Sequence, residues 1–195
     1  PLYSSAASDV YKRQIVISPP RSGGTKFCQD LEGITGYEFV GELATNSIIE
    51  FGAPWAKAKL NTHEIDNDES LTLSRYIDII DNQKDKIILC NISSHWMLPH
   101  ASHHLTRKNK RNIFTSVTNY WLKMWKGHLP PNFETNILGA VYRNMVIQDA
   151  WIEHKGIEPV YYETYFNNHP HLHPQLDQYD KKDEIFKWID LTLGS

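Results

Sequence analysis

"IVISPPRSGGTKFCQDLEG", residues 15–33, contains a short apolar run, then a turn rich in Pro, Ser and Gly, and then a helical pattern. This succession predicts a buried strand, a loop and a helix N-terminus. Backbone N–H groups at such a helix start, unobstructed by side chains at Gly23 and Gly24, can hold an anion. Arg21 adds a fork of N–H donors, and Thr25 adds a hydroxyl.

The loop departs from the nucleoside-triphosphate pattern GxxxxGK[ST]. Ser18 stands where the first glycine belongs, and Gly24 stands where the lysine belongs. Without that lysine, the anion must be held by backbone N–H groups, including that of Ser22, and by Arg21. The stretch therefore predicts a site for a tetrahedral dianion and leaves the identity of the ligand open.

Length and composition are typical of a globular protein. The chain has 195 residues, a formal net charge of -3 and 41% hydrophobic residues. This charge argues against general nucleic-acid binding, and no run reaches the ~18 apolar residues of a membrane span. Two cysteines form no disulfide framework, so we expect a reducing, cytoplasmic location. Residues 1–14 lack the apolar core of a signal peptide and are predicted to be a disordered or non-native leader, with a single domain over 15–195.

Strand and helix patterns alternate along the chain. Strands are predicted over 15–18, 36–43, 86–92, 103–107 and 158–166, and helices over 25–32, 70–81, 111–125, 135–156 and 181–194. Gly33 is expected to close the first of these helices. Strands separated by helices indicate a parallel sheet with crossover connections. The sequence thus predicts an α/β protein, a three-layer P-loop-type fold with a central, mainly parallel sheet flanked by helices.

A second candidate phosphate contact follows the predicted strand 103–107. A guanidinium at the strand end, Arg107, can bind a phosphate in bidentate fashion, and Ser116 lies nine residues later near the start of the next helix. The basic residues in between raise the local positive potential or form a solvated turn; they are Lys108, Lys110 and Arg111.

These two segments resemble the sulfotransferase family. "PPRSGGT" is similar to its 5′-phosphosulfate loop, although Gly24 replaces the usual Ser or Thr. That loop binds 3′-phosphoadenosine 5′-phosphosulfate (PAPS). The pair of Arg107 and Ser116 resembles the family's 3′-phosphate grip, in the spacing of a bacterial branch that includes trehalose sulfotransferases. The resemblance implies a PAPS site at the residues Arg21, Ser22, Gly23, Gly24, Thr25, Arg107 and Ser116, and no metal.

A third segment, "PVYYETYF" at 159–166, resembles a late strand of the family, V-x-Y-E-D-L. Tyr162 and Glu163 match, and Thr164 replaces the usual Asp. We expect Glu163 to buttress the phosphate-binding elements. The resemblance spans about residues 15 to 193 and thins between 43 and 85, where an acceptor-binding region would lie.

The resemblance implies sulfuryl transfer to a hydroxyl of a carbohydrate or another small molecule. Arg21 and the loop amides would stabilise the leaving phosphate, as in phosphoryl transfer. A general base would take the hydroxyl proton, and the candidates are Glu42, His95 and His63. Each of these three is also explained as a surface carboxylate or a hydrogen-bonded histidine.

Two other functions stay open: a P-loop kinase or nucleotide phosphotransferase, and a non-catalytic nucleotide-binding relative. The absent lysine and the Arg107–Ser116 pair argue against the kinase. The histidine-rich stretches at 100–104 and 169–174 lack the Cys and acidic companions of a metal site. The aromatic residues Tyr120, Trp121 and Trp125 are predicted to be core or to line an acceptor pocket.

Overall fold

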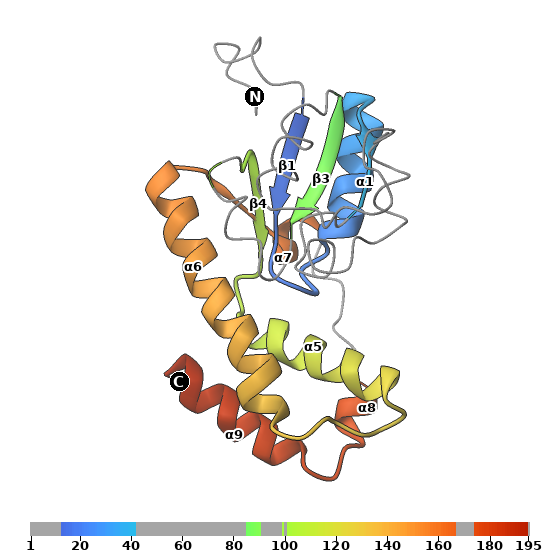
Figure 1. Ribbon diagram of the computed structural model, residues 1–195, viewed down its shortest axis with the longest axis vertical. Helices are drawn as coiled ribbons and strands as arrows, with labels where there is room; N and C mark the ends of the chain where they lie inside the picture. The colour runs from blue at the N-terminus through green and yellow to red at the C-terminus, as the bar shows by residue number, and fades with distance from the viewer. Residues whose placement is uncertain (1–12, 42–84, 91–98, 100, 167–173, 195) are drawn as a thin grey trace, which may run out of the picture. The chain divides into compact units, whose positions relative to one another are not determined.

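The apolar run that precedes the glycine loop forms a strand of a five-stranded sheet (Figure 1). The computed structural model describes residues 13–41, 85–90, 99, 101–166 and 174–194. The strands are β1 Arg13–Ile17, β2 Glu38–Phe39, β3 Lys86–Cys90, β4 His103–Thr106 and β5 Pro159–Tyr161. Their order is β2-β3-β1-β4-β5, and the pairings β1 with β3, β2 with β3 and β4 with β5 are parallel. The predicted α/β class, with a parallel sheet flanked by helices, is confirmed.

The chain divides into two compact units. The first comprises Pro1–Ile17 and Thr25–His103, and the second comprises Ser18–Gly24 and His104–Ser195. The glycine loop therefore belongs to the same unit as β5 and nearly all of β4. The predicted single domain over 15–195 stays a prediction, and residues 1–12 of the predicted leader lie outside the described residues.

In the first unit, β1 and β3 form the core. Ile15 pairs with Ile88, and both side chains are almost completely buried. Strands that are buried on both faces read as continuous apolar runs, which is why both were predictable. Helix α1, Gly24–Thr35, buries Phe27 and Leu31, which are four residues apart and share one helix face.

Among the described residues, the second unit contains most of the helices. They are α5 Arg111–Met124, the π-helical turn η2 Glu134–Leu138, α6 Gly139–Lys155, α7 Tyr162–Tyr165, α8 Pro174–Asp177 and α9 Lys182–Leu193. Helix α5 contacts α8 and α9 (Figure 1). Its Phe114 side chain is completely buried. The Asn119 side chain accepts hydrogen bonds from the backbone N–H groups of Gln175 and Leu176, which joins α5 to α8.

Some predicted boundaries were wrong. Helix α1 passes through Gly33 and ends before Gly36, whose φ of 71° suits the left-handed conformation of a helix C-terminus. Strand β2 is much shorter than the predicted 36–43. The strand predicted over 158–166 ends at Tyr161 and continues as α7, because Tyr162 and Glu163 turn to contact residues that follow β4. Tertiary contacts thus override the strand propensity of this aromatic segment.

The helix predicted over 70–81 lies outside the described residues. Within the described part of the chain, no helix has the length and apolarity that a membrane span requires.

Candidate anion-binding site

The loop between β1 and α1 has an unusual backbone conformation. Arg21 has a φ of 61° and Gly23 a φ of 80°. A positive φ costs energy for a residue with a side chain, so Arg21 must be held in place by its neighbours. Gly24 is buried and is the first residue of α1, where backbone N–H groups have no partner within the helix. The loop therefore has the helix-start character that the sequence predicted for an anion site. Thr25, the next residue, is exposed.

Gly23 lies against two aromatic side chains. A Cβ atom added there would lie 2.7 Å from Cε2 of Phe166 and 2.9 Å from ring carbons of Tyr162. Glycine is therefore required by both the backbone conformation and the packing. The role of Phe166 was not predicted. Tyr162 and Phe166 are four residues apart, a spacing that places two side chains on one face of a helix. This segment was predicted to be a strand, so the spacing was not recognised.

Arg107 directly contacts the glycine loop. Its Nε and Nη2 atoms donate hydrogen bonds to the carbonyl oxygen of Arg21 at 3.1 and 2.6 Å. The guanidinium lies 4.1 Å from the centre of the Tyr162 ring, and Arg107 is only 3% exposed. Burial lowers the pKa of Arg107; Tyr162 and Glu163 raise it, and Arg21 lowers it further. An arginine stays protonated in proteins, so a buried positive charge lies beneath the loop and fixes Arg21.

Glu163 holds the segment that follows Arg107. Its carboxylate accepts a hydrogen bond from the backbone N–H of Lys108 at 2.9 Å. Burial raises the pKa of Glu163, but the N–H groups of Lys108, Glu163 and Asn109, together with Arg107, outweigh burial and leave the pKa below its usual value. The carboxylate is therefore charged at neutral pH. The contact agrees with the buttressing role expected from the sequence.

Ser22 and Ser116 complete the described part of the predicted donor site. Ser22 is fully buried, and its hydroxyl has no hydrogen-bond partner among the described residues. The exposed Arg21 guanidinium lies 5.1 Å from the centre of the Tyr120 ring on α5. Ser116 lies four residues before Tyr120 and therefore shares its helix face. Of the predicted donor-site residues, Arg21 to Gly24, Arg107 and Ser116 occur in the second unit, and Thr25 belongs to the first.

Glu42, His95 and His63, the candidate bases, lie outside the described residues, as do residues 169–173 of the histidine-rich stretch 169–174. In the described part of the chain, no group of three or more His, Cys, Asp or Glu side chains could hold a metal ion.

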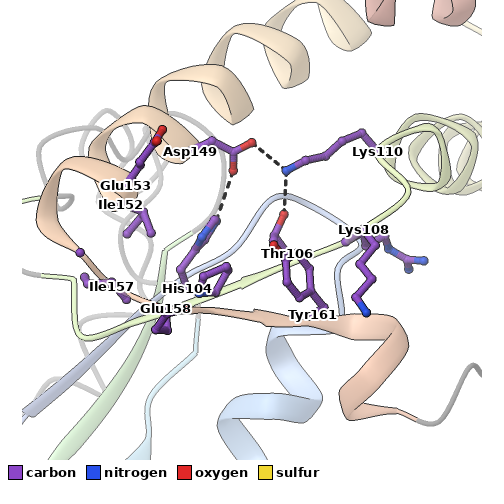
Figure 2. A pocket seen from close by; sticks show the side chains of 13 residues that line it. His104, Thr106, Lys108, Lys110, Asp149, Ile152, Glu153, Ile157, Glu158 and Tyr161 are labelled. Carbon is purple, nitrogen blue, oxygen red and sulfur yellow. Dashed lines mark hydrogen bonds and ion pairs between the residues drawn. The ribbon is translucent and has the colours of Figure 1, made fainter. Parts of the chain in front are cut away.

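A second polar cluster was not predicted. His104 on β4 lies with its Nε2 3.6 Å from Oδ1 of Asp149 on α6 (Figure 2). The Lys110 ammonium donates to Oδ2 of Asp149 at 2.7 Å and to the Thr106 hydroxyl at 3.0 Å. Burial lowers the pKa of His104 to about 4; Asp149 raises it and Lys110 lowers it. The imidazole is therefore neutral at pH 7.

The lowered pKa of His104 makes stability depend on pH. An unfolded histidine binds a proton near pH 6.5, whereas the folded one resists protonation until about pH 4. The contribution of His104 is therefore complete above pH 6.5 and is lost as the pH falls toward 4, at up to about 1.4 kcal/mol per pH unit. Urea denaturation between these values should show a flatter pH dependence for His104→Gln than for wild type. The exposed His154→Gln is the control. Equal slopes for wild type and His104→Gln would show that His104 is not held neutral.

The first cluster combines a glycine loop at a helix start with two arginines and a buried hydroxyl, which suits a ligand that carries phosphate groups. Its buried arginine, Arg107, donates to the Arg21 carbonyl and packs on the Tyr162 ring. Comparisons of the chain with models of known protein families and with curated proteins find no match.

Proposed function

We propose that this protein is a sulfotransferase that moves a sulfuryl group from PAPS to a hydroxyl of a carbohydrate or another small molecule. The observation that carries the proposal is the pair of hydrogen bonds from Arg107 to the Arg21 carbonyl. These residues come from segments 86 positions apart, which were selected from the sequence as the 5′- and 3′-phosphate contacts of one donor. Their meeting supports a ligand that is phosphorylated at both positions.

The loop and the strand end have separate roles in this proposal. The N–H groups at the start of α1 and Arg21 bind the phosphosulfate group of the donor. Arg107 and Ser116 bind its 3′-phosphate, and Arg107 also holds Arg21 in its positive-φ conformation. Glu163 fixes the chain directly after Arg107. Arg107 therefore links the two phosphate subsites, because it contacts both the 3′-phosphate and the loop that binds the phosphosulfate group.

The reaction needs one bond formed and one broken. The acceptor hydroxyl oxygen bonds to sulfur as the bond from sulfur to the bridging phosphate oxygen breaks, and adenosine 3′,5′-bisphosphate leaves. The acceptor proton passes to a base, for which Glu42, His95 and His63 stay the candidates. Arg21 and the loop amides stabilise the negative charge that grows on the phosphate. The site then acts chiefly by positioning and by charge stabilisation, as in phosphoryl transfer.

Calorimetric titration tests the donor class. Adenosine 3′,5′-bisphosphate should bind at least about tenfold more tightly than ATP, because hydrogen bonds to a charged 3′-phosphate contribute about 1.5–3 kcal/mol. ATP binding that equals or exceeds it would contradict the proposal and favour a nucleotide phosphotransferase. Tight binding of the bisphosphate without sulfuryl transfer to a broad panel of hydroxyl compounds would favour a non-catalytic nucleotide-binding protein.

Ser116→Ala and Arg107→Ala separate the two phosphate subsites. Ser116→Ala should weaken adenosine 3′,5′-bisphosphate by about 1.5–3 kcal/mol and leave adenosine 5′-phosphosulfate, which lacks the 3′-phosphate, unchanged. Arg107→Ala should weaken both ligands, because it also releases the Arg21 carbonyl. Calorimetry measures both affinities, and the exposed Thr135→Ala is the control. An equal loss of both ligands in Ser116→Ala would refute its assignment to the 3′-phosphate.

A further inference from the structure

A cavity of about 640 Å³ lies in the second unit, at the C-terminal part of α6 beside β4 and β5 (Figure 2). Its volume is in the range of small-molecule sites. The polar cluster of His104, Asp149 and Lys110 lines it. The loop residues Ser18–Gly24 do not line it, whereas Arg107 of the candidate anion site does, so the two sites are adjacent and share this residue.

His104 is the unsatisfied group of this cavity. Its side chain is 3% exposed, and neither ring nitrogen has a hydrogen-bond partner among the described residues. The closest acidic oxygen, on Asp149, is 3.6 Å from Nε2, which is too long for a hydrogen bond. Figure 2 shows the ring directed toward Asp149 and α6. Because buried polar groups are nearly always hydrogen-bonded, this imidazole lacks partners that a ligand can provide.

The hydrogen-bond donors and acceptors of the lining indicate which class of ligand fits the cavity. A neutral imidazole has one N–H donor and one acceptor nitrogen, so it needs partners of both kinds. Asp149 offers acceptor oxygens, and Lys110 offers an ammonium that is already bonded to Asp149 and Thr106. Hydroxyl groups both donate and accept, and they match this mixture.

The remaining lining supports an uncharged ring. Apolar surface comes from Ile152, Ile157, Pro159 and Tyr161, which can cover the C–H face of a sugar. The other charged residues of the lining are of both signs: Arg107, Lys108, Glu153 and Glu158. An isolated anion would meet three carboxylates, and a cation would meet two ammonium groups and a guanidinium. A neutral molecule avoids both of these unfavourable charge interactions.

We propose that the cavity beside β4, β5 and α6 binds a neutral polyhydroxylated small molecule, such as a sugar, whose hydroxyl groups complete the hydrogen bonds of His104 and Asp149. This binding requires no nucleotide at the glycine loop. The cavity can therefore be tested without nucleotide, and failure of this proposal is distinguishable from failure of the proposed sulfotransferase activity.

The ring resonances of His104 provide a direct test in the wild-type protein. Nitrogen-15 NMR at pH 7, without nucleotide, should show a saturable shift of both His104 ring nitrogens on addition of glucose, myo-inositol or maltose. The signals of the exposed His154 should not move. Inorganic phosphate should leave His104 unshifted. Absence of a saturable shift with all three polyols, or a response to phosphate alone, would overturn the proposal.

Variants then locate the binding. His104→Leu and Asp149→Asn should each weaken the polyol that binds wild type by at least about tenfold, because each loses hydrogen bonds within the cavity. His154→Gln should bind as wild type does. Circular dichroism checks that each variant is folded. If a variant is not folded, the NMR titration of the wild-type protein alone tests the proposal. Unchanged affinity in a folded His104→Leu would place the polyol elsewhere and overturn the proposal.

Discussion

Replacing Gly23 by alanine is expected to destabilise the protein by at least about 2 kcal/mol and to abolish tight binding of adenosine 3′,5′-bisphosphate. The new Cβ would require a residue with a side chain at a φ of 80°. It would also lie within 3 Å of the Tyr162 and Phe166 rings. Tyr162 packs against the buried Arg107, so relief of the clash by moving this ring would disturb the contact that holds the loop. Urea denaturation measures the stability, and calorimetry measures the affinity.

Gly33→Ala is the matched control. Gly33 lies inside α1 without a positive φ, and a Cβ there would have no heavy atom within 4 Å. Because alanine is the better helix former, this variant should gain about 0.5–1 kcal/mol of stability and keep wild-type affinity. If Gly23→Ala has the same stability and the same affinity for adenosine 3′,5′-bisphosphate as wild type, the loop does not have the described conformation.

Substitution of the catalytic base should have the largest effect on turnover. If Glu42 takes the acceptor proton, Glu42→Gln should keep donor affinity and lower turnover by ~10²–10⁴-fold. The same result is expected of His95→Asn if His95 is the base, and only one of the two should show it, since one proton needs one acceptor. Steady-state rates with a confirmed acceptor measure the effect. Glu38→Gln, an exposed carboxylate on β2, is the control.

The pH profile gives a second readout of the base. A carboxylate with an ordinary pKa leaves the rate flat above about pH 5.5, whereas an imidazole gives a rise centred near pH 6.5. A buried carboxylate can imitate the imidazole, so the variants decide. Wild-type rates in both variants would transfer the assignment to His63 or to a reaction without a protein base.

The central strands were predictable because fully buried strands have a mostly apolar composition. β1 and β3 are short apolar runs, as expected of parallel strands covered on both faces. The end of β5 was not predictable in this way. Tyr162 leaves the strand because its ring packs on Arg107, and Glu163 accepts from the Lys108 N–H, 55 residues away. Local propensity has no information about such distant partners.

The candidate site was predictable in its residues and less so in its contacts. The glycine loop and Arg107 were identified from pattern and resemblance, but the sequence predicted a phosphate as the partner of Arg107. In the structure its partners include the Arg21 carbonyl and the Tyr162 ring. The cluster of His104 and Asp149 had no sequence signal, because it depends on how α6 packs beside β4. Such a contact follows from tertiary structure alone.

A crystal structure of the protein with adenosine 3′,5′-bisphosphate tests the proposed donor site most directly. We expect the 5′-phosphate on the backbone N–H groups of Ser22 to Thr25, and the 3′-phosphate within hydrogen-bond distance of both Arg107 and Ser116. A bisphosphate whose 3′-phosphate contacts neither residue, or whose 5′-phosphate lies away from the loop, would contradict this expectation.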